Sequence, residues 1–197
     1  MPVSYTNRKG LTYTLYRGQT KTGKPRYYFA RTSQGKGEPV TELPPGFTIS
    51  ESVNGVVSLV KDRPSLIQPE EVAAIEVAVQ QHPEARRYRV AVKHDQIEIY
   101  EQAGPDYEEL LGELHMVVLS RPGLAERLQA EQERYARYTP VLRFILLDPT
   151  RRRFGAQRMC YLGSIDGWLE LGQTGPMATL ARTLIPTLGT EQFYELW

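Results

Sequence analysis

The sequence lacks the features that define several large classes of protein. Its 197 residues include one cysteine, Cys160, so no disulfide can form within the chain, and a reducing compartment is expected. No apolar stretch approaches the roughly 18 residues of a membrane-spanning helix. The first ten residues have no apolar signal-peptide core. We therefore expect a soluble, cytoplasmic protein with no membrane partner.

Motifs that bind nucleotides or build familiar catalytic centres are also missing. The chain has no G-x-G-x-x-G and no G-x-x-x-x-G-K-[ST] loop. The segment Gly163–Gly167 does not place its serine as a nucleophile elbow does. The three histidines, His82, His94 and His115, are not spaced like paired metal ligands. We expect no metal, no cofactor and no catalytic centre.

Charge is distributed unevenly along the chain although the total is nearly neutral. The formal net charge is +1, yet residues 1–50 carry eight basic and two acidic side chains. Residues 51–150 carry eleven basic and seventeen acidic, and residues 151–197 carry five and four. All eight N-terminal cations precede the first acid, Glu38. This asymmetry favours an anionic partner for the first segment; the alternative is a basic sheet that faces an acidic region of the same molecule.

Short strands separated by turn residues are expected up to about residue 63. Leu11–Arg17 alternates between apolar and polar residues, and Pro25–Arg31 reads as its return strand. Pairing the two predicts one face, with Arg26 and Tyr28, that is both basic and aromatic. A sheet needs only one buried face, so this second face can meet a ligand. Further strands are expected at 40–43, 47–51 and 56–60, the last two joined by Asn54-Gly55.

The rest of the chain alternates between helical and strand periodicity, which predicts an α+β fold with mainly antiparallel strands. With a linker at 102–106, we expect two lobes that can also pack as one unit. Residues 1–102 form a basic meander with a helix and a hairpin, and residues 107–197 form a helical segment, antiparallel strands and a C-terminal helix. Helices are predicted at 69–82, 107–118, from about 124 to 138 and at 176–185, and strands at 88–92, 97–99, 141–147, 154–162 and 168–171.

A mixture of cations and tyrosines marks the candidate binding site. Proteins that bind single-stranded nucleic acid neutralise phosphates with cations and stack bases on ring faces. The N-terminal sheet carries this mixture, and the arginine run at 151–153 adds an anion contact at a hairpin tip. We expect a nucleic-acid-binding or accessory protein, with single strands favoured, that uses Arg17, Lys24, Arg26, Tyr28, Arg31, Arg151, Arg152 and Arg153.

Two other functions fit the same residues. A protein-interaction or self-assembly module would use the basic sheet to meet an acidic protein, or the acidic half of a second copy in an oligomer. An enzyme of a type without a recognised motif would use Cys160, His115 or Asp166. Arg158 lies two residues from Cys160 on the same strand face, where a positive charge favours the thiolate.

Overall fold

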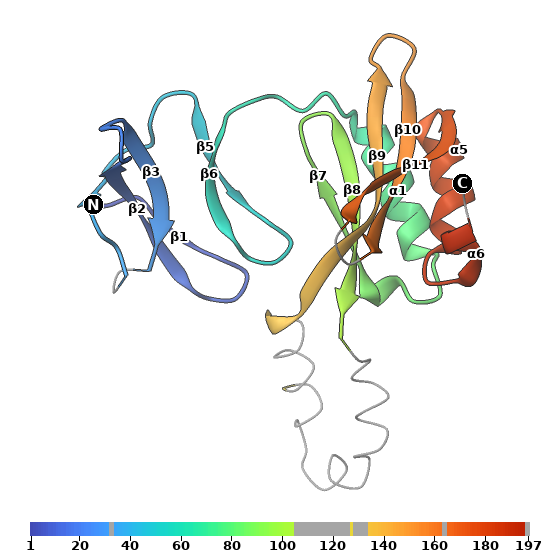
Figure 1. Cartoon of the computed structure of the whole chain (residues 1–197), viewed down its shortest axis with the longest axis horizontal. Coiled ribbons are helices and arrows are strands. Elements are labelled where there is room, and N and C mark those ends of the chain that lie inside the picture. Colours follow the sequence, from blue (N-terminus) through green and yellow to red (C-terminus); the bar gives the residue numbers. More distant parts are fainter. Residues whose placement is uncertain (32–33, 105–126, 128–133, 163–164, 196–197) are drawn as a thin grey trace, which may run out of the picture. The chain divides into compact units, whose positions relative to one another are not determined.

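The computed structural model describes residues 1–31, 34–104, 127, 134–162 and 165–195 and divides the chain into two compact units (Figure 1). The first unit comprises Met1–Asp62 and Ala103–Arg137, and the second comprises Arg63–Gln102 and Tyr138–Trp197. This division differs from the two lobes expected from the sequence, which comprised residues 1–102 and 107–197. The expected α+β class with antiparallel sheets is confirmed.

Two antiparallel sheets of short strands form the described part of the first unit. The larger sheet has the order β1-β2-β3, with β4 also pairing to β2, and β5 and β6 form a separate hairpin. The hairpin turns at Asn54-Gly55 as expected, and Gly55 has a φ of 77° that suits glycine. The strands are β1 (Ser4–Thr6), β2 (Thr12–Gln19), β3 (Pro25–Ala30), β4 (Glu38–Pro39), β5 (Phe47–Glu51) and β6 (Val57–Lys61).

Strand β2 is buried on both faces at its centre. Leu15 and Tyr16 are both buried, although successive side chains of a strand point to opposite faces. The Tyr16 ring is stacked with that of Tyr28, and a Cβ placed on Gly35 would overlap the Tyr16 ring. The segment after β3 therefore covers a face that the sequence analysis left open to ligand.

A five-stranded antiparallel sheet forms the centre of the second unit, in the order β11-β10-β9-β8-β7 (Figure 1). Its middle strand is β9, whose run of apolar residues suits a strand with neighbours on both sides. The hairpin β7–β8 and the strands after residue 137 belong to one sheet, which is why they share a unit. The strands are β7 (Tyr88–Val92), β8 (Gln96–Ala103), β9 (Arg137–Asp148), β10 (Arg153–Leu162) and β11 (Ile165–Gly175).

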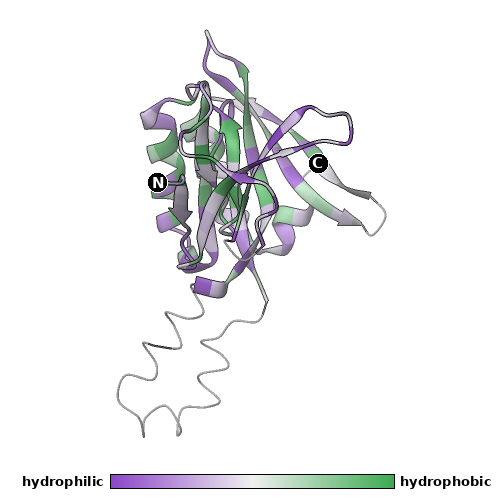
Figure 2. Ribbon diagram, turned by 90° about the vertical axis from the view of Figure 1, so that its left-hand side faces the viewer, coloured by the Kyte–Doolittle hydropathy of each residue, from purple (hydrophilic) through white to green (hydrophobic). Residues whose placement is uncertain are grey.

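Helices pack on this sheet and complete the core of the second unit. Ile75 and Leu184 come from the two longest described helices, and they join Ile99 and Phe144 of the sheet in one buried cluster. Phe193, from the last described helix, is also in this cluster. Figure 2 shows hydrophobic and hydrophilic residues following one another along the strands and helices of the chain. The helices are α1 (Pro69–Gln80), η1 (Ala85–Arg87), α5 (Met177–Leu184), η2 (Ile185–Thr187) and α6 (Glu191–Glu195).

Part of the expected helical segment falls outside the described residues. The helix expected at 107–118 lies there entirely, and the next expected helix lies there up to residue 133, apart from residue 127. That second helix was predicted to reach about Tyr138, but the chain is already in β9 from Arg137. Among the described residues, no helix is long and apolar enough to cross a membrane.

One buried carboxylate ties together three segments of the second unit. Glu71 is 9% exposed, and its Oε2 accepts a hydrogen bond from the Gln68 amide at 2.8 Å, at the start of α1. Arg152 donates from Nε to Glu71 Oε1 at 2.8 Å and from Nη2 to Oε2. The same Nη2 donates to the Leu66 carbonyl at 3.1 Å. The β9–β10 turn is thereby bound to α1 and to the segment that precedes it.

We expect Glu71→Ala to lower the free energy of unfolding by about 3 kcal/mol, because Arg152 would lose its counter-ion and the Gln68 amide its acceptor. This is the lower end of the range for a broken buried pair, since the Arg152 side chain is 26% exposed. Urea denaturation measures the change. The control, Glu76→Ala, removes an exposed carboxylate from the same helix and should cost less than about 0.5 kcal/mol. Equal effects of the two substitutions would contradict a structural role for the pair.

Candidate nucleic-acid interface

Exposed cations gather in the first unit. Seven of the eight basic residues that precede Glu38 are exposed. One of the seven, Arg8, has an internal contact described below, and the other six form the cation set. Within the described ranges, none of the six is part of a salt bridge. The described residues therefore leave these charges available to an external anion. The six are Arg17, Lys21, Lys24, Arg26, Arg31 and Lys36.

The predicted residues of this unit lie on both faces of the β2–β3 hairpin. Arg26 is paired with Gly18 and shares a face with Tyr28, whereas Arg17 is paired with Tyr27 on the opposite face. Lys24 lies in the turn, where its carbonyl accepts a hydrogen bond from the Thr20 amide at 2.8 Å. The fifth residue, Arg31, follows the last residue of β3. Arg31 therefore lies at the far end of β3, and the other three cations surround the turn end of the hairpin on both of its faces.

A shallow polar depression of about 230 Å³ lies at this end of the hairpin. Arg17 and Glu38 both line it, and the two residues are cross-strand partners between β2 and β4. Glu38 is exposed and reduces the positive field on the Arg17 side. Arg26, on the other face, has no acidic residue opposite it, because its cross-strand partner is Gly18.

Tyr28 is held by contacts within its own unit. Its ring centroid lies 6.0 Å from that of Tyr16, with 25° between the ring planes. Its hydroxyl accepts a hydrogen bond from the Lys36 amide at 3.1 Å and donates one to the Lys36 carbonyl. One face of the ring and the hydroxyl are thus already occupied. Tyr28 anchors the backbone of an exposed cation, whereas the sequence analysis assigned it to base stacking.

The other two N-terminal cations have internal contacts. Arg8 donates from Nη2 to the Ala136 carbonyl at 2.9 Å. Lys9 is partly buried, and this burial, together with the positive charges of Arg8 and Arg137, lowers the pKa of its ammonium group. These two residues are therefore poorer phosphate contacts than the other six N-terminal cations.

The arginine run predicted at a hairpin tip lies in the β9–β10 turn of the second unit, and its members differ. Arg152 is bound to Glu71, so its charge is already paired. Arg151 is exposed and lies 4.0 Å from Asp148. Arg153 is exposed and donates to Thr174 Oγ1 at 2.7 Å. Two of the three arginines are thus open to solvent.

The residues of the enzymatic alternative form no recognisable catalytic set in the described part of the chain. Cys160 is a half-buried free thiol on β10, paired with Gly167 of β11. Asp166 precedes Gly167 and is paired with Tyr161, and His115 lies outside the described residues. No group of three or more histidine, cysteine or acidic residues suited to a metal ion occurs among the residues described.

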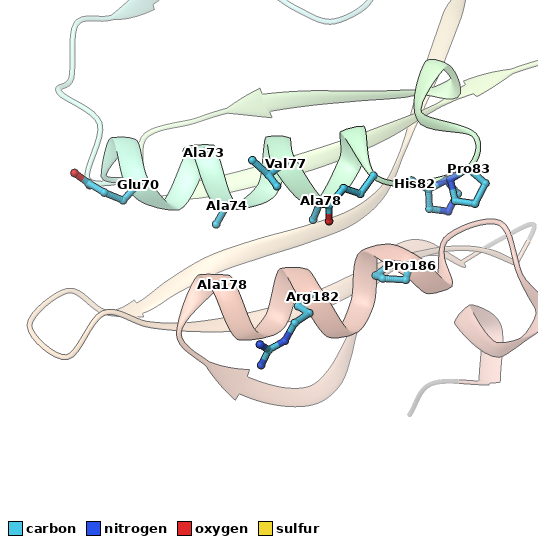
Figure 3. Close-up of a pocket in the computed structure, with 11 residues that line it drawn as sticks. Glu70, Ala73, Ala74, Val77, Ala78, His82, Pro83, Ala178, Arg182 and Pro186 are labelled. Carbon is cyan, nitrogen blue, oxygen red and sulfur yellow. The ribbon is translucent and has the colours of Figure 1, made fainter.

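A groove that the sequence analysis did not predict lies between α1 and α5 in the second unit (Figure 3). It has a volume of about 460 Å³. Small or apolar side chains form most of its lining, and Glu70 and Arg182 are its charged residues. The sequence does hold a signal for this groove. Alanines lie beside the core-facing residues of α1, and these small side chains leave space on the outer side of the helix. The small and apolar lining residues include Ala73, Ala74, Val77, Ala78, Ala178 and Pro186.

Comparison of the chain with protein-family models, with curated proteins and with solved structures found no match. The function is therefore argued from the residues and contacts described above.

We expect Tyr28→Phe to lower the free energy of unfolding by about 1 kcal/mol, because it removes the hydroxyl that bonds to the Lys36 backbone. Tyr27→Phe is the matched control: this hydroxyl, on the opposite face of β3, has no hydrogen bond among the described residues. Urea unfolding followed by circular dichroism measures both variants. A loss in Tyr27→Phe as large as in Tyr28→Phe would show that the Lys36 contact contributes nothing specific.

Proposed function

We propose that the first unit binds the phosphate backbone of single-stranded nucleic acid through the exposed cations around the β2–β3 hairpin. The observation that carries the proposal is the set of six exposed cations without salt bridges among the described residues. Phosphates supply the missing counter-charges, and the release of their counterions drives such binding.

The placement of the cations favours a single strand over a duplex. Arg17 and Arg26 lie on opposite faces of the hairpin, and Lys24 lies in the turn between them. A flexible strand can bend around this end and meet all three side chains, whereas a stiff duplex would meet one face at a time. Contacts made to phosphates carry no direct sequence information, so binding is expected to tolerate different sequences.

The predicted residues do not all have the same role in this proposal. Arg17, Lys24, Arg26 and Arg31 contact phosphates, and Tyr28 positions Lys36 through its hydroxyl. In the second unit, Arg151 and Arg153 supply an anion contact of their own. Arg152 is excluded from that contact because Glu71 neutralises it.

A titration against salt tests the proposal. A labelled oligothymidine long enough to span the cation set is titrated with the protein between about 50 and 200 mM salt, and affinity is followed by fluorescence anisotropy. We expect a log–log slope of about −0.7 for each neutralised phosphate. Arg17→Gln combined with Arg26→Gln should make the slope shallower by about 1.4, the amount for two single-strand phosphates.

The control removes two positive charges elsewhere. Lys61 and Arg63 are both exposed, and neither is in the cation set, so Lys61→Gln with Arg63→Gln should leave the slope nearly unchanged. The variant that combines Arg151→Gln with Arg153→Gln measures separately how much the second unit contributes to the salt slope. The proposal fails if the wild type does not bind at about 50 mM salt, where phosphate contacts are strongest. It also fails if the control pair flattens the slope as much as the Arg17 and Arg26 pair.

A further inference from the structure

The groove between α1 and α5 combines a hollow with a protruding side chain. Val77 is 51% exposed beside the hollow, and the neighbouring walls are built from the small residues Ala74, Ala78 and Ala178. Figure 3 shows Glu70 at the first turn of α1 and Arg182 on α5, on the other side of the groove. An exposed apolar surface with a polar rim is typical of a protein contact.

The interior of the groove offers little to a small polar ligand. His82 lines it but is buried and fully hydrogen-bonded. Its Nε2 donates to the Leu188 carbonyl at 3.2 Å, and its Nδ1 accepts from the Glu84 amide at 3.1 Å. Small-molecule sites normally present a few convergent polar groups that fix the ligand. The occupant that fits this lining is an apolar side chain from another protein surface.

The charges on the rim of the groove indicate which protein surface supplies this apolar side chain. Glu70 and Arg182 are both exposed, and neither forms a salt bridge with another described residue. A partner of one charge sign would match only one of them. A two-fold axis over the groove would instead bring each Glu70 to the Arg182 of the other copy, so both charges are paired. The net charge of +1 adds little repulsion between copies.

We propose that the α1–α5 groove is the contact surface of a symmetric dimer of this chain. Val77 of each copy enters the groove of the other, and each Glu70 pairs with the other copy's Arg182. This inference concerns the second unit and does not depend on nucleic-acid binding. The volume of the groove accommodates only a few side chains, so the dimer belongs to the weak, concentration-dependent class.

Charge exchange tests the proposed contact. Sedimentation velocity of nucleic-acid-free protein over a range of concentrations should show a monomer–dimer equilibrium for the wild type. Glu70→Arg alone places two arginines opposite each other at each contact, and Arg182→Glu alone places two glutamates there, so each variant should be monomeric. An equimolar mixture of the two variants should dimerise again, because each contact in the mixed dimer joins an arginine to a glutamate. The double variant should dimerise for the same reason.

The control variant is Glu76→Arg, which changes the charge of an exposed residue on α1 that does not line the groove. It should dimerise as the wild type does. Circular dichroism checks that every variant is folded, as expected for substitutions at exposed positions. A wild type that remains monomeric at the highest concentration overturns the proposal. So does a mixture of folded single variants that remains monomeric, or a single variant that dimerises as the wild type does.

Discussion

The pairing of β8 with β9 is the constraint on which the second unit depends. The two strands are neighbours in one sheet although β8 ends at Ala103 and β9 begins at Arg137. This pairing joins the β7–β8 hairpin to the three C-terminal strands and creates one apolar surface on which α1 and α5 both pack. It also explains how the groove arises, since two helices from distant parts of the sequence must lie side by side to form it.

Local patterns predicted the elements better than they predicted the assembly. Periodicity predicted the register of β2 with β3 and the helices α1 and α5, because each of these depends on residues close together in the sequence. The shared sheet could not be predicted in this way, since pairing between distant strands leaves no local signal. The linker expected at 102–106 begins within β8, which runs to Ala103.

The candidate site shows the same limit at the level of side chains. Exposed cations could be predicted because the first acid follows all of them. The internal contacts of Tyr28 could not be predicted, because they depend on how the chain folds back after β3. There the Lys36 backbone bonds to the Tyr28 hydroxyl, and Gly35 lies against the Tyr16 ring that stacks on Tyr28. In the same way, the sequence does not distinguish the three consecutive arginines at 151–153. In the structure Arg152 alone of the three is paired with Glu71, which is remote in sequence.

Arg152 faces two demands that no single alternative residue meets. Its φ of 50° is in the left-handed region, which glycine and asparagine adopt at little cost and in which most other residues are strained. Its guanidinium group also reaches both oxygens of Glu71, a forked geometry that lysine cannot reproduce. Replacements that relax the backbone would leave a buried carboxylate unneutralised, and a lysine that kept the charge would retain the strain. This tip is therefore a poor place for loop insertions or affinity tags, although a hairpin turn would ordinarily be among the most permissive positions of a fold.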